Sequence, residues 1–353
     1  MDKQDIISYS IDELKGYLAS IGEKSFRAIQ IHEWLHKKLA VSFEEMTNIS
    51  NGLKEKLNND FYIETLDIVR VLTSKTDGTQ KFLFRLRDGN VIESVLMRYR
   101  HGNSVCISTQ VGCRMGCKFC ASTLDGLVRN LTASEMLTEI YHIQRFSGER
   151  VSNVVLMGSG EPMDNFDNVI KFIKDISDEN GLHISQRNIT ISSCGIIDRI
   201  KEMADMGLQV TLALSLHAAD DDTRKSLMPV AYKYTIDEIL DVCRYYFNKT
   251  GRRITFEYSL VAGVNDTKEE SDKLVRLIRG MNCHVNLIPV NPIKERNYKK
   301  SDKVNTDIFK NNLEKNGINA TIRREMGADI QGACGQLRKS FIEDEAIEKE
   351  VSS

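Results

Sequence analysis

The sequence predicts an α/β protein built on a parallel sheet with crossover helices. From about residue 104 onward, short runs of β-branched and apolar residues alternate with longer helical patterns. One such helix begins at a capping box formed by Thr132 and Glu135. The runs are SVCIST, SNVVLMG, RNITISS, LQVTLALSLH, RITFEYSLV, CHVNLIPV and NATIRR. This alternation is compatible with a doubly wound sheet and with a (β/α) barrel.

The first hundred residues have a different pattern. SIDELKGYL opens with a capping box, Ser10 with Glu13, and SFRAIQIHEWLHKKL is amphipathic, so short helices are expected. KFLFRLRDGNVIESVLMRYR predicts a hairpin with Asp88-Gly89 at the turn. We therefore divide the chain into a helical accessory domain, a hairpin or adaptor, an α/β core and a frayed tail, at residues 1–60, 61–100, 101–340 and 341–353.

Composition indicates a soluble cytoplasmic protein. Hydrophobic residues make up 41% and charged residues 28% of the 353-residue chain, and no run of eighteen apolar residues predicts a membrane span. The polar N-terminal stretch lacks the hydrophobic core of a signal peptide. A net charge of −2 neither indicates nor excludes a nucleic-acid partner, because local patches do the binding. Eight cysteines in such a chain favour metal binding or catalysis over a disulfide scaffold.

The unusual sequence motifs fall where the predicted strands end. Parallel α/β folds build active sites at the carboxyl ends of their strands, so these motifs predict one composite site. In chain order they are GCRMGCKFCAST, GSGEP, SSCG, SLH, VNP and GADIQGACGQL.

The first of these motifs carries Cys113, Cys117 and Cys120 in a Cys-x3-Cys-x2-Cys spacing. Thiolates select zinc, copper(I) or iron–sulfur clusters, but a zinc finger would show a second cysteine pair and a bacterial ferredoxin a nearby fourth cysteine before proline. The motif resembles that of the radical SAM superfamily. The resemblance implies that the three thiolates hold a [4Fe–4S] cluster whose fourth iron binds S-adenosylmethionine, and Phe119 also fits the pattern.

The same resemblance assigns cofactor-binding residues at the other strand ends. Glu161, beside Gly160 in GSGEP, is expected to contact the methionine ammonium, for which a carboxylate is a suitable partner. It leaves open which serine of ISSCG, Ser192 or Ser193, touches the cofactor. The expected cofactor-binding residues are Gly160, Glu161, Ser192, Ser215, Leu216, His217 and Asn291.

Two further cysteines are expected near this site. Cys106 lies in the first strand of the core, in phase with Ser108 and Gln110, which predicts a thiol on a polar, inward face. Cys334 lies in the glycine-flanked loop GACGQL, which follows the last strand. Cys243, by contrast, has the spacing of a helical core residue.

A closer resemblance covers about residues 10 to 340. SFRAIQIHEWLHKK, SFEEMTNIS, VIESVLMRY, CISTQVGCRMGCKFCAST, HVNLIPVNP and ACGQL together resemble the RlmN family of dual-specificity RNA methyltransferases. The resemblance implies an open (β/α)6 barrel with a small N-terminal helical, RNA-binding accessory domain. It also implies methylation of adenosine C2 in the peptidyl-transferase region of 23S rRNA and just 3′ of the anticodon in tRNA. A one-electron donor such as flavodoxin and a monomeric state are further expectations.

The family mechanism, carried onto this chain, uses two S-adenosylmethionine molecules per turnover. Cys334 takes a methyl group from the first, and the second supplies the radical that activates this methyl for attack on C2. Glu93 takes the C2 proton, and Cys106 then attacks the Cys334 sulfur to form a disulfide and release the RNA.

Two alternatives stay open at this point. A Cfr-type enzyme would methylate C8 of the same rRNA adenosine; Pro162 after Gly-Glu favours the C2 enzymes. A non-catalytic iron–sulfur RNA-binding protein would bind RNA without cleaving S-adenosylmethionine.

Overall fold

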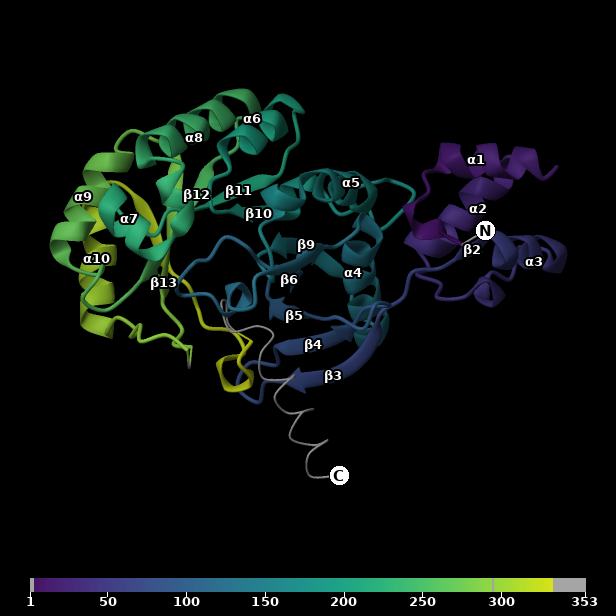
Figure 1. Ribbon diagram of the computed structural model, residues 1–353, viewed down its shortest axis with the longest axis horizontal. Helices are drawn as coiled ribbons and strands as arrows, with labels where there is room; N and C mark the ends of the chain where they lie inside the picture. The colour runs from purple at the N-terminus through teal and green to yellow at the C-terminus, as the bar shows by residue number, and fades with distance from the viewer. Residues whose placement is uncertain (1–2, 294, 333–353) are drawn as a thin grey trace.

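A ten-stranded mixed sheet organises most of the chain (Figure 1). The computed structural model describes residues 3–293 and 295–332, so Cys334 and the expected tail at 341–353 lie outside the described residues. The strand order is β14-β13-β12-β11-β10-β9-β6-β5-β4-β3. Because the strands from β6 to β14 follow each other in chain order without reversal, the sheet is wound as a barrel and not doubly wound.

Parallel pairing runs from β6 to β14, and β14 and β3 are the two edges, so the barrel is open. This arrangement confirms the expected open (β/α)6-type barrel, with β14 as an additional short strand. The parallel strands are β6 (Gly102–Cys106), β9 (Val151–Leu156), β10 (Ile189–Ser193), β11 (Thr211–Ser215), β12 (Ile254–Leu260), β13 (Cys283–Pro289) and β14 (Asn319–Ile322).

Crossover helices cover the outer face of these strands, as Figure 1 shows. The predicted capping box at Thr132 and Glu135 is present at the start of α4, and a second one, Thr235 with Glu238, starts α8. The helices are α4 (Ala133–Ser147), α5 (Phe166–Ile176), α6 (Ile197–Asp205), α7 (Asp221–Leu227), α8 (Ile236–Thr250), α9 (Lys268–Ile278) and α10 (Lys303–Lys315).

The predicted hairpin at 81–100 is confirmed and extends the barrel sheet. It consists of β4 (Gln80–Arg85) and β5 (Val91–Tyr99), which pair antiparallel, with β3 (Asp67–Thr73) outside them. β5 also pairs antiparallel with β6, the first parallel strand. Most residues of β5 are buried on both faces, as expected of a strand inside a sheet and not at its edge.

Three helices form the N-terminal part of the chain, to one side of α4 and α5 in Figure 1. They are α1 (Ile11–Ser20), α2 (Phe26–His36) and α3 (Asn51–Asp60), accompanied by the short parallel pair β1 (Gln4–Asp5) and β2 (Phe61–Tyr62). The predicted capping box at Ser10 and Glu13 starts α1.

The accessory helices pack directly on the barrel. His36 on α2 hydrogen-bonds through Nδ1 to the Tyr141 hydroxyl on α4 at 2.8 Å, and Arg145 pairs with Glu45. Buried apolar residues of both parts belong to one continuous cluster. No helix among the described residues has the length and apolar character needed to span a membrane.

Candidate active site

A cavity lies where the parallel strands end. Its wall is formed by residues from the loop after β6 and from the ends of β9 to β13, the position where parallel α/β folds bind ligands. The wall includes nine of the residues expected from the sequence: Cys113, Cys117, Cys120, Gly160, Glu161, Ser192, Ser215, His217 and Asn291.

The three cysteines lie on a loop between two short antiparallel strands, β7 (Gln110–Gly112) and β8 (Leu127–Asn130). This loop also packs on the end of α7, because the Lys118 amide donates to the Leu227 carbonyl at 2.9 Å. Phe119 lies edge-on to the His217 ring, with centroids 4.8 Å apart. The cysteine loop is therefore fixed at its base and on one side before any ligand binds.

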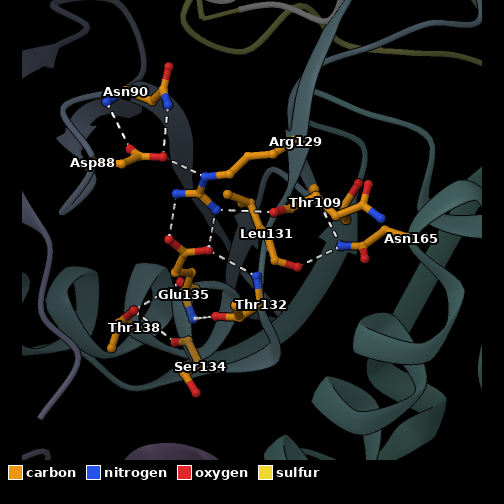
Figure 2. Close-up of polar contacts among 11 residues, drawn as sticks. Asp88, Asn90, Thr109, Arg129, Leu131, Thr132, Ser134, Glu135, Thr138 and Asn165 are labelled. Atoms are coloured by element: carbon orange, nitrogen blue, oxygen red, sulfur yellow. Dashed lines mark hydrogen bonds and ion pairs between the residues drawn. The ribbon is translucent and has the colours of Figure 1, made fainter. Parts of the chain in front are cut away.

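Figure 2 shows the polar contacts that anchor the base of this loop. Arg129 on β8 lies between the carboxylates of Asp88, at the β4–β5 turn, and Glu135, in the first turn of α4. Its two terminal nitrogens donate to the two Glu135 oxygens, each at 2.8 Å. The Asn165 amide donates to the carbonyls of Thr109 and Leu131 at 2.8 and 2.7 Å. These bonds join the cysteine loop to the hairpin, to α4 and to the segment after β9.

The chemistry of the three thiols fits a bound iron–sulfur cluster. Burial raises the pKa of Cys113 to about 12, and burial followed by the neighbouring cysteine charges raises the pKa of Cys117 well above its ordinary value. Thiolates at these positions therefore need a cationic partner such as iron. Within 3–293 and 295–332, no three His, Cys, Asp or Glu side chains are arranged to bind one metal ion together. In an iron–sulfur cluster, by contrast, each thiolate binds a different iron.

Glu161 presents a buried carboxylate to the cavity. Its Oε2 accepts a hydrogen bond from the Cys194 amide at 2.8 Å and its Oε1 accepts one from the Met163 amide at 3.1 Å. Burial raises the pKa of the Glu161 carboxyl, and the hydrogen bonds from its neighbours oppose this effect. Gly160 before it has φ +110°, and a Cβ there would lie 2.6 Å from the Gln110 Cβ. Glycine therefore lets this turn approach the β7 segment.

Alternation along β10 distinguishes its two serines. Ser192 lies on the cavity wall, and its hydroxyl is 3.5 Å from that of Ser215 at the end of β11. Ser193 is not part of that wall, is 1% exposed, and its hydroxyl accepts a hydrogen bond from the Gly195 amide. The structure therefore favours Ser192 over Ser193 as the residue facing a ligand.

His217 is held in an unusual backbone conformation, with φ +58°. Its Nδ1 accepts a hydrogen bond from the Ser259 amide at 2.9 Å, and burial lowers its pKa to about 3, so the imidazole is neutral. The Asn265 side chain donates to the His217 carbonyl at 2.7 Å. Leu216, also expected at the site, is fully buried and its side chain is not part of the cavity wall.

Cys106 lies on the wall of a second, adjoining cavity. The two cavities share Met157, Ile288, Asn291 and Arg323. Gly332, the last described residue, also lines the second cavity and precedes Cys334 by two positions.

Glu93 lies on β5, two residues before Val95, which lines the second cavity. Its carboxylate is buried and lies 3.5 Å from the Lys81 ammonium, which is equally buried. Glu93 itself is on neither cavity wall among the described residues. Alternation along the strand nevertheless places Glu93 on the same face of β5 as Val95.

Glu257 and Ser259 of β12 also line the first cavity, although the sequence reasoning did not select them. Burial raises the pKa of Glu257, whose Oε1 accepts a hydrogen bond from the Asn286 amide at 3.1 Å. The available signal was the two-residue spacing of polar residues within an otherwise apolar strand, FEYSL. Cys243, predicted to be a core residue, is fully buried on α8.

Comparisons with known proteins define the class. The family model of the radical SAM superfamily matches residues 107–277, the part of the chain that carries the cysteine loop and most of the cavity wall. The chain is therefore a radical SAM protein, and membership of this superfamily implies a [4Fe–4S] cluster and S-adenosylmethionine. A second model, the ribosomal RNA large subunit methyltransferase N-terminal domain, matches residues 4–63.

More similar relatives narrow the assignment. The chain is 65% identical over 340 residues to a probable dual-specificity RNA methyltransferase RlmN from Lachnospira eligens, covering 96% of this chain and 97% of that protein. It is 60% identical to a protein of the same description from Lachnoclostridium phytofermentans, covering 99% and 98% of the two chains. A crystal structure of a radical SAM methyltransferase from Sphaerobacter thermophilus superposes with a TM-score of 0.91 at 40% identity, covering 95% of this chain and 99% of that one. The chain belongs to the RlmN family.

Proposed function

We propose that this protein is a radical SAM RNA methyltransferase that acts on adenosine C2, in the peptidyl-transferase region of 23S rRNA and just 3′ of the anticodon in tRNA. The observation that carries the proposal is the pair of adjoining cavities. One holds three cysteines and the Glu161 carboxylate, and the other holds the Cys106 thiol and the chain segment that leads to Cys334. Family membership supports the substrate class, because the relatives are described as dual-specificity RNA methyltransferases.

The residues of the first cavity would bind the cofactors. Cys113, Cys117 and Cys120 would hold the cluster, which supplies the electron for reductive cleavage of S-adenosylmethionine when bound. Glu161 would accept the methionine ammonium, since its carboxylate is buried and already oriented by two backbone amides. Ser192, Ser215, His217 and Asn291 would contact the remainder of the cofactor, and Leu216 would contribute through its backbone.

The residues of the second cavity would carry the methyl group. Cys334 as a thiolate would displace the methyl from one S-adenosylmethionine, and a second molecule would be consumed to activate it, giving two per turnover. Glu93 would accept the proton lost from C2. Cys106 would then attack the Cys334 sulfur, so that the sulfur–sulfur bond forms as the sulfur–carbon bond to the RNA breaks, and the released carbon takes up a proton to complete the methyl group. The Lys81 ammonium, 3.5 Å from the Glu93 carboxylate, would orient this carboxylate.

The test combines cofactor cleavage with product analysis. Reconstituted protein, reductant, methyl-labelled S-adenosylmethionine and rRNA or tRNA fragments should yield 5′-deoxyadenosine and RNA methylated at C2 by mass spectrometry. Cys334→Ala should abolish methyl transfer while retaining iron, whereas Cys283→Ala, at the start of β13, should leave both unchanged. Methyl transfer by Cys334→Ala would contradict the proposed carrier. RNA binding without 5′-deoxyadenosine would indicate the non-catalytic alternative, and methylation at C8 would indicate a Cfr-type enzyme.

We also propose that the protein works as a cytoplasmic monomer reduced by a one-electron donor such as flavodoxin. Sedimentation of the cluster-loaded protein should give a mass near 40.1 kDa. Reduced flavodoxin should replace a chemical reductant in the cleavage assay.

A further inference from the structure

Arg224 is a fully buried arginine directly behind the cysteine loop. It lies on α7, in the crossover after β11, and is 0% exposed. Its Nε donates to the Leu216 carbonyl at 3.1 Å, and its Nη2 donates to the Cys194 and Ser215 carbonyls at 2.8 and 3.2 Å. These carbonyls lie at the ends of β10 and β11, so the guanidinium fixes two strand ends that line the candidate active site.

The neutral carbonyls leave the positive charge of this guanidinium uncompensated. Within the part of the chain that the structure describes, Arg224 has no ion pair with a carboxylate, and its Nη1 is buried without a hydrogen-bond partner. The ionisable side chains around it are Cys194, Cys117, Asp221 and Cys243. An isolated buried cation is costly, so a native protein retains one only where a counter-charge is available.

Most of these groups are unsuited to balance the charge. Burial raises the pKa of both Cys194 and Cys243 far above the ordinary range, so both thiols are neutral. Asp221 is a carboxylate on the same helix, but among the described residues it forms no ion pair with Arg224, and its Oδ1 accepts a hydrogen bond from the Ile236 amide at 2.9 Å. Cys117 belongs to the cysteine loop, which is joined to the end of α7 by the hydrogen bond from the Lys118 amide to the Leu227 carbonyl, so a cluster bound by this loop would place negative charge near the guanidinium.

We propose that Arg224 is the counter-charge of the iron–sulfur cluster and raises its reduction potential. The inference rests on the proposed cluster at Cys113, Cys117 and Cys120. Each electron added to the cluster makes it more negative, so a fixed buried cation stabilises the reduced form more than the oxidised form. Arg224 is thus a positioning residue that also tunes the cluster. Its helix, α7, ends at Leu227, whose carbonyl accepts a hydrogen bond from the Lys118 amide of the cysteine loop.

Arg224→Gln is the main test, because glutamine keeps donors for the carbonyls and removes the charge. We expect the reconstituted variant to bind iron and sulfide as the wild type does. In an EPR-monitored redox titration without substrate, its ratio of reduced to oxidised cluster at a fixed potential should be about tenfold lower, a midpoint shift of about 59 mV to lower potential. An unchanged midpoint in a cluster-loaded variant would overturn the proposal.

Arg224→Lys separates charge from shape. The variant should have a near wild-type midpoint at neutral pH, and the midpoint should fall toward that of Arg224→Gln at alkaline pH, because a buried lysine can lose its proton whereas arginine stays charged. A merely structural role for the arginine predicts instead that both variants have equal, pH-independent midpoints.

Arg252→Gln is the matched control. Arg252 contacts Thr211 at the opposite end of β11, so its removal changes the net charge equally but far from the cysteine loop. The midpoint potential of the cluster in Arg252→Gln should equal that of the wild type. If Arg224→Gln binds no cluster, the thermal stabilities of the metal-free variant and the metal-free wild type are compared instead. A metal-free variant as stable as the wild type supports the counter-charge, and a less stable one overturns it. Absence of a cluster from the wild type would contradict the proposed function itself.

Discussion

Gly158, after β9, shows how a single residue shapes the cavity. A Cβ on Gly158 would lie 2.6 Å from the Ile107 carbonyl oxygen and 2.8 Å from the Ser108 nitrogen, which are both backbone atoms. Because backbone cannot move aside as a side-chain end can, the turn after β9 depends on the absence of a side chain here. The polar groups of Glu161 and Gln110 are brought together by this close approach.

Gly158→Ala should therefore destabilise the protein by about 2–4 kcal/mol, as expected for overpacking against backbone. Urea denaturation of the metal-free protein measures this change. Gly52→Ala is the control, because Gly52 lies in α3 with nothing within 4 Å of an added Cβ, and should be neutral or stabilising by up to about 1 kcal/mol. Equal stability of the two variants would contradict the proposed clash.

Glu161→Gln tests the carboxylate at the same turn. We expect S-adenosylmethionine to bind the cluster-loaded variant roughly 10- to 100-fold more weakly, because a charge-assisted hydrogen bond to the ammonium becomes neutral. Equilibrium dialysis gives the dissociation constant. Glu149→Gln, which removes an ion pair with Arg98 away from the cavity wall, should leave this constant unchanged. Unaltered affinity in Glu161→Gln would remove this residue from the cofactor site.

At the scale of elements, the cysteine loop depends on the short pair β7 and β8. Two-stranded ribbons are marginal by themselves. Here the pair is joined to neighbouring elements through Arg129, which contacts the β4–β5 turn and the first turn of α4 (Figure 2). The antiparallel hairpin thus supports the metal-binding loop as well as extending the sheet.

Arg129→Gln should lower the free energy of unfolding by about 1–3 kcal/mol, since it leaves the buried Glu135 carboxylate with weaker partners. The double variant with Glu135→Gln should recover part of this loss, because the unpaired charge is then removed. A double-mutant cycle by urea denaturation measures the coupling. Additive effects of the two substitutions would show that the contact contributes little.

At the scale of the whole molecule, the accessory helices and the barrel meet around groups with displaced pKa values. Burial, assisted by the Arg145 charge, lowers the pKa of His142 to about 4; its Nε2 accepts a hydrogen bond from the Leu66 amide at 3.2 Å. Burial, assisted by the Asp5 and Glu135 charges, raises the pKa of Glu64 to about 7. The two residues therefore link folding to pH with opposite signs.

His142→Gln should become more stable relative to the wild type as the pH falls. The folded protein keeps His142 neutral, whereas the unfolded chain protonates it below about pH 6.5, so the wild type loses stability between pH 6.5 and 4. At pH 5 we expect this effect to change the difference in the free energy of unfolding between His142→Gln and the wild type by about 1–2 kcal/mol. Urea denaturation at several pH values measures it. A pH-independent difference would contradict the displaced pKa.

Glu64→Gln should show the opposite trend. Folded Glu64 keeps its proton up to about pH 7 and the unfolded chain loses it near pH 4.5, so the wild type is stabilised at low pH and loses this stability as the pH rises. Relative to the wild type, the variant should therefore gain stability between pH 4.5 and 7. Parallel pH profiles for the two proteins would rule this linkage out.

The sequence predicted the elements well where the patterns were local. Capping boxes at Ser10 and Thr132, the Asp88-Gly89 hairpin and the alternation of strands and helices are each encoded within a few residues. The cysteine spacing and the strand-end motifs likewise predicted nine residues of one cavity wall. Glu257 and Arg224 were missed because their significance depends on burial, which a two-residue or helical spacing does not reveal.

The sequence by itself determined the family, the α/β class and the identity of the thiols and carboxylates that can do chemistry. Only the tertiary structure decided that Ser192 and not Ser193 lies on the cavity wall, and that Cys106 lies on an adjoining cavity. The physical reason is that residue types and local patterns depend on neighbours in the sequence. Strand order, side-chain direction and the charge balance around Arg224 depend on contacts between segments that are distant in the sequence.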